Sequence, residues 1–473
     1  MAVAPPPRAL VPVLVFVGTV VAVISSLGAP LVPAVAATLD ASLPDAQWSL
    51  TATLLVGAVA TPVVGRLGDG PHRRRVVLVV LGVVTLGGVL AALPLDLGWL
   101  VAGRALQGVG LGLTPLAIAT AREALAGQRA RSTIAALSVT VAAGVGLGYP
   151  LAGLVAELGG VRAAFWAGAG VSLVALLASA AVLPRATTTH RSRLDVVGAL
   201  LLGAGLAALL VALGEAETWG WSSPALWGLL AGAAAALACW ARWEWRTPSP
   251  LVDLRLARGR VALTAHVAAL LVGLSNYLLL ATVPVLAQSP VADGAGFGVS
   301  IVVAGLVLLP FSAATVLAGR WARLAADRGG QHLVLPVAAL VQCAAFVLFG
   351  LARTDLWLLF VVMGVAGLGV GASFAAFPAL VVSAVPPSET SSAMSLNQVL
   401  RYVGFSLGST LTATVLAAAT PQGGAPAAGG YTAIAVVGGA ACLLTAVVAR
   451  LGLARRPPVD APAPAVASGT GTG

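Results

Sequence analysis

The amino-acid sequence predicts an all-α integral membrane protein whose helices cross the bilayer many times. Of the 473 residues, 59% are hydrophobic and 9% are charged, whereas soluble domains carry about 25% charged residues. The apolar residues form fourteen runs of roughly 20 residues, the length of a bilayer-spanning helix, and tryptophans lie near many of their ends. These runs lie near residues 9–37, 47–67, 75–95, 99–122, 132–156, 163–183, 195–214, 224–241, 261–287, 299–319, 332–352, 356–384, 391–419 and 430–450.

The basic residues predict how these helices are oriented. All 26 are arginines, and 22 of them lie in loops or tails on one side of the predicted helices, against two on the other side. Because positively charged loops resist translocation, the arginine-rich side is predicted to be cytoplasmic, with both termini there. The net charge of +10 therefore indicates contact with anionic membrane lipid and not with nucleic acid.

Two matching pairs of motifs predict two related six-helix halves. Gly65-Arg66 follows the second predicted helix and Gly319-Arg320 follows the tenth, at an offset of 254 residues. Alternate glycines at 108–112 recur at 367–371, at an offset of 259 residues. Internal repeats that flank a midplane site are typical of secondary transporters. The predicted organisation is a cytoplasmic N-terminus (1–8), a six-helix bundle (9–183), a linker with two inserted helices (184–260), a second six-helix bundle (261–450) and a disordered cytoplasmic tail (451–473).

The loop at residues 65–75 is expected to act as a conformational latch. Gly65 lets the preceding helix end close to a neighbour, and Asp69 can accept hydrogen bonds from a helix start or pair with nearby arginines. In the alternative interpretation the arginines of this loop only set the orientation of the chain. The predicted latch residues are Gly65, Asp69, Arg73 and Arg74, with Asp327 and Arg328 in the second half.

Two arginines are predicted to lie inside the membrane. Arg104 lies about five residues into the fourth predicted helix, where an arginine is costly unless it faces a cavity or a partner; the alternative is snorkelling to the outer interface. Arg401 lies near the middle of the thirteenth helix, where it either lines the substrate or ion path or serves as a hydrogen-bonding hub between helices. The residues expected on the coupling or substrate path are Arg104, Gln107, Arg401, Asn397, Gln398, Asn276 and Tyr149.

Glycines and a proline in three predicted helices indicate close helix–helix contacts and a bend. For the run around residue 150, packing alone is an alternative to a role in transport. The residues expected to pack helices are Gly108, Gly110, Gly112, Gly144, Gly148, Pro150, Gly153, Gly404 and Gly408.

These motifs resemble those of the major facilitator superfamily. The loop at 65–75 matches the family pattern G-x-L-x-D-R-x-G-R-[RK] at five positions and departs from it at Gly70 and His72, and residues 104–110 look like its R-x-x-Q-G-x-G motif. Fourteen helices, with Leu194-Asp195 opening the seventh, are similar to the fourteen-helix drug:proton antiporter subfamily. The antiporter motif of the fifth helix is imperfect, because Tyr149 replaces a glycine.

The resemblance implies the major facilitator fold, with two six-helix bundles that alternately expose a central site, plus the two inserted helices. It also implies that the first, fourth, ninth and twelfth helices line the cavity and that Arg104 takes part in proton coupling.

The distribution of acids narrows the chemistry. All sixteen carboxylates fall in loops or at predicted helix ends, so the buried cations favour neutral or anionic hydrophobic substrates. A coupling proton would then be carried by a helix-end acid such as Asp40 or Glu157, or by the substrate. A P-loop needs a lysine, and the chain has none. No cofactor, metal site or catalytic set is predicted, and the energy source is expected to be the proton gradient.

The sequence thus predicts a monomeric secondary transporter of the bacterial inner membrane, with hydrophobic small molecules, protons and lipid as partners. The expected activity is efflux of a drug, antibiotic or metabolite. One alternative is uptake or facilitated exchange of an endogenous solute. A second alternative, a membrane receptor or lipid-processing enzyme, would require a catalytic cluster at one interface, and the sequence shows none.

Overall fold

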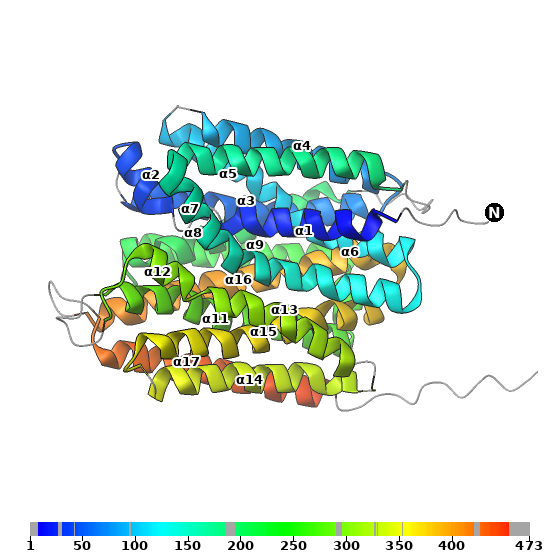
Figure 1. Ribbon diagram of the computed structural model, residues 1–473. Helices are drawn as coiled ribbons and strands as arrows, with labels where there is room; N and C mark the ends of the chain where they lie inside the picture. The colour runs from blue at the N-terminus through cyan, green and yellow to red at the C-terminus, as the bar shows by residue number, and fades with distance from the viewer. Residues whose placement is uncertain are drawn as a thin grey trace, which may run out of the picture.

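Helices lying side by side along one axis make up the molecule (Figure 1). The computed structural model describes residues 8–26, 31–41, 43–93, 96–184, 194–289, 296–325, 328, 330–351, 353–420 and 426–453, and this part of the chain contains no strand. Asp327 lies outside the described residues, as do the side chains of Tyr149 and Pro150 and the surroundings of Gly153.

The first group of helices comes from the first half of the chain. Its elements are α1 (Leu10–Ser26), α2 (Val32–Thr38), α3 (Leu43–Gly68), α4 (Arg73–Ala92), α5 (Leu97–Gly108), η2 (Val109–Gly112), α6 (Leu113–Ala124) and α7 (Gly127–Val182). α1 packs along α7, α3 along α5, and α4 along both α5 and α7. α7 consists of two helices that join at Gly160, whose φ of 78° is a backbone conformation that glycine adopts without strain.

The second group is built in the same way. Its elements are α11 (Arg260–Gln288), α12 (Ile301–Leu306), α13 (Leu309–Ala325), α14 (Gln331–Leu351), α15 (Leu356–Ala384), η5 (Pro387–Glu389), α16 (Thr390–Ala418) and α17 (Ala428–Leu453). The repeated glycines occupy matching contacts in the two groups. Gly108 lies against the carbonyl of Thr53 on α3, and Gly367 lies against that of Phe311 on α13.

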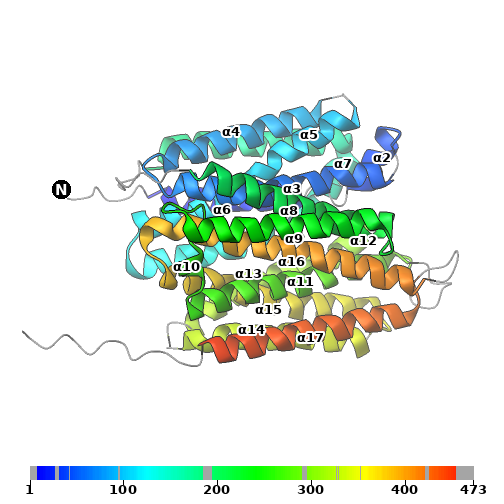
Figure 2. The same ribbon diagram turned by 180° about the vertical axis from the view of Figure 1, so that it is seen from behind.

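Three further helices cover the boundary between the two groups. They are α8 (Val196–Trp219), α9 (Pro224–Arg246) and α10 (Leu254–Ala257). Figure 2 shows α8 and α9, in green, in front of this boundary. α8 packs against both α3 and α16, so the inserted helices contact one element from each half.

Twelve helices in the described part of the chain are long and apolar enough to cross a membrane, against the fourteen segments predicted. The first predicted segment is divided between α1, which has 17 residues, and the seven-residue α2. The fifth and sixth segments share α7, of which Leu154–Val182 meets the length and composition of a span. The predicted fourth helix is interrupted by η2, and the eighth runs five residues beyond its predicted end, to Arg246.

One end of the bundle gathers the arginine-containing turns, and we call it the arginine-rich end. α1 begins and α17 ends there (Figures 1 and 2). At this end Arg260 donates to the carbonyl of Leu451 and Arg323 to that of Ser132. α17 continues to Leu453, so the first three residues of the predicted tail are helical, and its remainder lies outside the described residues.

Gly404 provides a test of how closely α16 lies against α11. A Cβ at this position would meet the carbonyl of Leu270 and lie 2.9 Å from the backbone nitrogen of Leu274. We expect Gly404→Leu to push these helices apart and lower the free energy of unfolding by about 1–3 kcal/mol, measured as a lower melting temperature in detergent. Gly82→Leu is the control, because nothing lies within 4 Å of its added Cβ. Equal losses in both variants would contradict the packing argument.

Candidate functional site

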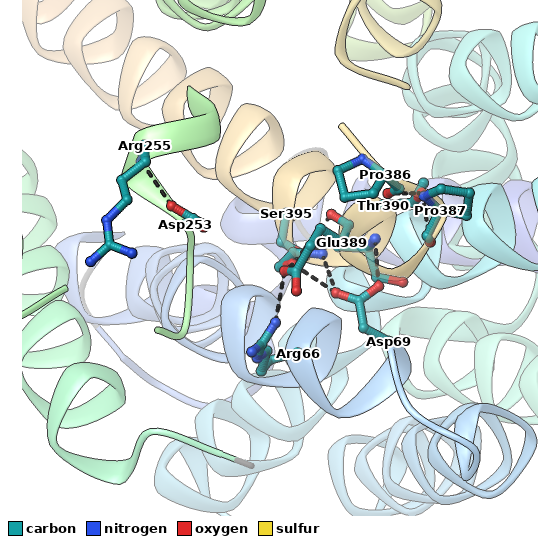
Figure 3. A network of polar contacts seen from close by, with 11 residues as sticks. Arg66, Asp69, Asp253, Arg255, Pro386, Pro387, Glu389, Thr390 and Ser395 are labelled. Carbon is teal, nitrogen blue, oxygen red and sulfur yellow. Dashed lines mark hydrogen bonds and ion pairs between the residues drawn. The ribbon is translucent and has the colours of Figure 1, made fainter. Parts of the chain in front are cut away.

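Asp69 joins the two halves at the arginine-rich end. It follows α3 and is fully buried. Its carboxylate accepts hydrogen bonds from the backbone N–H groups of Ser391 (2.8 Å) and Ser392 (3.0 Å) and from the Ser392 hydroxyl (2.7 Å). These donors belong to the first turn of α16, where free N–H groups and the helix dipole favour an anion. Asp69 therefore caps a helix of the other half (Figure 3).

The environment of Asp69 has two opposing electrostatic effects. Burial raises the pKa of this carboxyl above its usual value, and the hydrogen bonds from Ser392 and Ser391 lower it in part. The ionised form is the better acceptor for three donors, so the contact with α16 depends on the charge of Asp69.

Further polar contacts reinforce this junction. Arg66 forms an ion pair with Glu389 at 2.7 Å (Figure 3). Arg122, at the end of α6, donates to the carbonyl of Val385 at 3.2 Å and to the hydroxyl of Thr390 at 2.5 Å. These residues were not among the predicted latch residues. A sequence signal for them exists, since Glu389-Thr390-Ser391-Ser392 has the composition of a helix start.

Gly65 lies where α3 approaches α16 closely. A Cβ there would meet the hydroxyl of Ser395 and lie 3.0 Å from the carbonyl of Ser391. The glycine thus lets α3 lie directly against the first turns of α16, and this approach places Asp69 at the helix start.

The remaining predicted latch residues make no described contact across the boundary. Arg73 donates to the carbonyl of Gly68 at 2.7 Å and pairs with Glu123. Arg74 donates to the carbonyl of Ala180 at 2.6 Å. Both sets of partners lie in the first half, so these two arginines support the α3–α4 turn from within. Arg328 is exposed.

Arg104 lies fully buried on α5 and is held by main-chain oxygens. It donates to the carbonyls of Ile24 (2.9 Å) and Ser49 (3.2 Å) and to the side-chain oxygen of Gln107 (2.8 Å). Among the described residues no carboxylate lies within ion-pair distance, and Nη2 has no hydrogen-bond partner. These bonds connect α1, α3 and α5 and hold the side chain inside the bundle, away from the snorkelling position. Its coupling role stays a prediction.

Gln398 makes a second bond between the halves, within the helical bundle. Its side-chain nitrogen donates to the carbonyl of Leu111 at 2.7 Å and contacts the Tyr402 hydroxyl at 2.6 Å. Leu111 lies in η2, four residues before Pro115. Because proline has no N–H, Pro115 leaves the Leu111 carbonyl without its usual helical donor, and Gln398 supplies one from α16.

Arg401 lies one turn further along α16. It is 5% exposed, its guanidinium carbon stands 4.4 Å from the ring centre of Phe374 on α15, and Nε has no hydrogen-bond partner. The Tyr402 and Tyr277 rings each contact Phe405, at 6.0 and 5.9 Å between centres. A buried cation thus lies beside an aromatic cluster.

The two predicted asparagines lie on different helices. Asn397 of α16 donates to the carbonyl of Ala265 on α11 at 3.0 Å and lies 3.4 Å from His266. Asn276 is buried on α11. The structure therefore brings Asn397 to the contact between α11 and α16, Gln398 to the boundary between the halves, and Arg104 with Gln107 to a separate cluster in the first half.

The packing glycines differ in what they contact. Gly144 meets Ala22 of α1, and Gly408 lies 2.5 Å from the carbonyl of Leu274, measured from its added Cβ. Gly148 is buried. The contacts of Gly110 and Gly112 are with Val84 and Val64, both at 2.7 Å from the added Cβ.

One carboxylate near a helix end, Glu244, is buried, which the hydropathy pattern does not indicate. This residue lies within α9 and is 2% exposed. The prediction ended the helix at residue 241, whereas the indole N–H of Trp240 binds the Glu244 carboxylate at 2.8 Å and allows an acid on the buried face. Asp40 and Glu157, the acids expected to carry a proton, are exposed.

A cavity of about 380 Å³ opens between the halves at the arginine-rich end. Arg122, Arg131 and Arg323 provide its charge, and no acid is among the described residues that line it. Its apolar wall includes Ile134 and Val382. The cavity therefore suits apolar or anionic molecules better than cations. The part of the chain that the structure describes holds no group of three potential metal ligands.

Asp69→Asn tests the junction with α16. The amide keeps the shape but loses the charge, and hydrogen bonds to a charged group contribute about 1.5–3 kcal/mol. We expect a cysteine at Ser395, in a background without the native cysteines, to react with a maleimide roughly tenfold faster in this variant. Asp253→Asn is the control, because Asp253 caps only α10, through the Arg255 N–H. An unchanged labelling rate in Asp69→Asn would contradict the role of this carboxylate.

Gln398→Leu tests the bond across the boundary. The variant leaves the Leu111 carbonyl without its donor, which costs about 1–3 kcal/mol for a buried group. We expect a lower melting temperature in detergent. Pro115→Ala restores a backbone N–H four residues after Leu111, so it should recover part of the loss when combined with Gln398→Leu. Additive losses in the double variant would show that the two residues do not share this carbonyl.

Comparison with known proteins supplies the family. The family model described as Major Facilitator Superfamily matches residues 14–196 and 265–471. The unmatched residues between these two segments, 197–264, contain almost all of α8, with α9 and α10. The solved structure of the human organic anion transporter MFSD10 aligns over its whole length with 94% of this chain, at a TM-score of 0.65 and 17% sequence identity. This is a similarity of fold.

Three curated relatives span most of the chain. An uncharacterized MFS-type transporter of Mycobacterium tuberculosis is 29% identical over 84% of this chain, which covers only 57% of that relative. A triacylglyceride transporter of Mycolicibacterium smegmatis is 29% identical over 76% of this chain and 66% of its own length. The tetracenomycin C resistance and export protein of Streptomyces glaucescens is 29% identical over 84% of this chain and 73% of its own length. The chain is a multi-pass membrane transporter that belongs to the Major Facilitator Superfamily.

Proposed function

We propose that this chain is a proton-driven exporter of hydrophobic small molecules that are neutral or anionic. The observation that carries this proposal is the buried Arg401. Its guanidinium lies on the Phe374 ring and forms no ion pair with any described acid. A buried cation without a counter-charge is costly, so an anionic or electron-rich aromatic molecule would bind there more favourably than a cation.

The junction at the arginine-rich end supports alternating access. Asp69, Arg66 and Arg122 hold the two halves together through a few polar contacts with residues 385–392. Such contacts can exchange for water when the halves separate, whereas the glycine contacts within each half are apolar and close. The junction therefore favours movement between the halves over movement within them.

We further propose the topology of the fourteen-helix antiporter subfamily. α1 and the part of α7 before Leu154 supply the two crossings beyond the twelve candidate spans. The halves are residues 9–183 and 261–450, with α8 and α9 inserted between them. The arginine-rich end faces the cytoplasm of a bacterial cell, both termini lie there, and the transporter acts as a monomer.

The names of relatives support the substrate class. One relative is named for resistance to and export of tetracenomycin C, and another as a triacylglyceride transporter. Both names point to apolar cargo. The cavity, whose described lining includes three arginines and no acid, suits such cargo where it also carries a negative charge.

Arg401→Ala tests this function in a drug-susceptibility panel with an efflux-deficient host. We expect the wild type to raise the host's resistance to apolar compounds. In Arg401→Ala, resistance to anionic compounds should fall roughly tenfold, because the loss of one contact to a charged group has about this effect. Arg401→Lys should keep part of the effect. Arg162→Ala is the control, because Arg162 is exposed.

Vesicle measurements then separate export from uptake. Accumulation in inverted vesicles, abolished when the proton gradient is collapsed, agrees with the proposal. Accumulation only in right-side-out vesicles indicates uptake and overturns it, and equal resistance in wild type and Arg401→Ala removes Arg401 from the substrate site.

A further inference from the structure

Two buried carboxylates converge between the inserted helices, away from Arg104 and Arg401. Asp195 precedes α8 and is 9% exposed, and Glu244 on α9 is 2% exposed. A Cβ at Gly198 would lie 2.5 Å from Oδ2 of Asp195 and 2.8 Å from Oε1 of Glu244. The two side chains therefore share one small space, and any residue larger than glycine at position 198 would fill it.

The hydrogen-bond donors around this pair are neutral. Trp243 donates its indole N–H to Oδ2 of Asp195 at 2.8 Å, and Trp240 donates to Oε1 of Glu244 at 2.8 Å. The backbone N–H of Gly198 caps Oδ1 of Asp195 at 2.9 Å. The backbone N–H groups of Leu251 and Val252 also lie next to the Glu244 carboxylate, although Oε2 makes no hydrogen bond of standard geometry. All of these donors are uncharged.

No described cation balances the pair. The only ion pairs in the described part of the chain are Arg66–Glu389 and Arg73–Glu123. Two nearby arginines contact Trp245 instead. Arg255 of α10 donates to the Trp245 carbonyl at 2.8 Å, and the guanidinium carbon of Arg258 lies 4.5 Å from the centre of the Trp245 ring.

The other elements packed around the pair present apolar side chains. The hydrophobic cluster that contains Trp240 includes Leu251 and Val252 of the segment before α10, Val399 of α16 and Val59 of α3. Two ionised carboxylates would thus lie together in an apolar surrounding.

We propose that Asp195 and Glu244 form a proton-binding site in which the pair holds one proton at neutral pH. Two carboxylates that share a site without a cation do not both ionise readily, and burial of the charged groups adds to this cost. A proton from water converts the Glu244 carboxylate to the neutral acid, and its release to water regenerates the carboxylate. The inference deepens the proposed function by naming where a coupling proton binds; proton binding itself does not rest on it.

The site lies beside the junction that Asp69 makes with α16. The chain continues from Leu251 and Val252 into Asp253, which Figure 3 shows next to the start of α16. A small cavity of about 10 Å³, lined by Val252, Asp253, Glu389 and Ser392, separates the two regions, which is about the space of one water. A change of charge at the pair therefore acts next to the residues that hold the halves together.

The test is infrared difference spectroscopy of the purified protein in lipid nanodiscs, without substrate, between neutral and alkaline pH. We expect the wild type to show the C=O band of a protonated carboxyl at neutral pH and to lose it at alkaline pH. Glu244→Gln should lack this band. Asp195→Asn should keep it but lose it at a pH lower by about one unit or more, because the like charge is gone. The control Asp355→Asn changes an exposed acid.

An unchanged band in Glu244→Gln, or an unchanged titration in Asp195→Asn, would overturn the proposal. If Glu244→Gln is unstable, Glu244→Asp is measured as the second variant. It keeps an acid at this position and should therefore show the C=O band of a protonated carboxyl at neutral pH. Transport assays are a separate readout. If the pair binds a proton while export is independent of the proton gradient, the site stands and the proposed coupling fails.

Discussion

A polar group buried in a membrane protein must find its partner inside the protein, because the lipid offers none. Here the partners are mostly main-chain atoms of other helices. Arg104 donates to the carbonyls of Ile24 and Ser49, and Asp69 accepts from the first N–H groups of α16. Each bond joins a side chain to the main chain of a different helix. The polar groups thereby determine which helices stay together.

Glycines make this arrangement possible by bringing helix backbones close to one another. Without a hydrophobic drive between helices in lipid, close packing supplies much of the association energy. Within each half the contact is backbone against backbone, as for Gly404 against the Leu270 carbonyl. Between the halves, Gly65 serves the same purpose at only one end. The halves are therefore internally tight. Between them, α7 packs against α13 and α15 and α3 against α16, and the hydrogen bonds of Asp69 and Gln398 add to this contact.

Sequence reasoning predicted the features that depend on local pattern. Hydrophobic run length predicted the helices, and the motif spacing predicted two related halves, in which Gly108 and Gly367 lie against carbonyls of α3 and α13. It identified Asp69 but not its partner, because Ser391 and Ser392 lie more than 320 residues away and only the fold brings them together. Long-range pairing of this kind leaves no periodic trace in one sequence.

The burial of Glu244 was missed for a different reason. The charged residues at 242, 244 and 246 lower the hydropathy of the run, so the helix was expected to end at 241. Trp240 and Trp243 lie one turn apart on α9 and donate hydrogen bonds to the carboxylates of Glu244 and Asp195. These bonds offset part of the cost of burying the two acids. Hydropathy averages over a window and does not register such a donor. A tryptophan four residues before an acid is the signal that could have indicated it.

α16 is the element on which these features meet. Ser391 and Ser392 bind Asp69, Gln398 bonds to Leu111, and Arg401 lies ten residues after Ser391, about 15 Å along the helix at 1.5 Å per residue. Val399 of the same helix packs against the inserted helices. A helix moves as a rigid rod over such a length, so release of its first turn from Asp69 also displaces Gln398 and Arg401. Coupling between sites requires an element with two arrangements that both sites bias. By position, α16 meets this requirement better than the Arg104 cluster, whose described bonds all lie within one half.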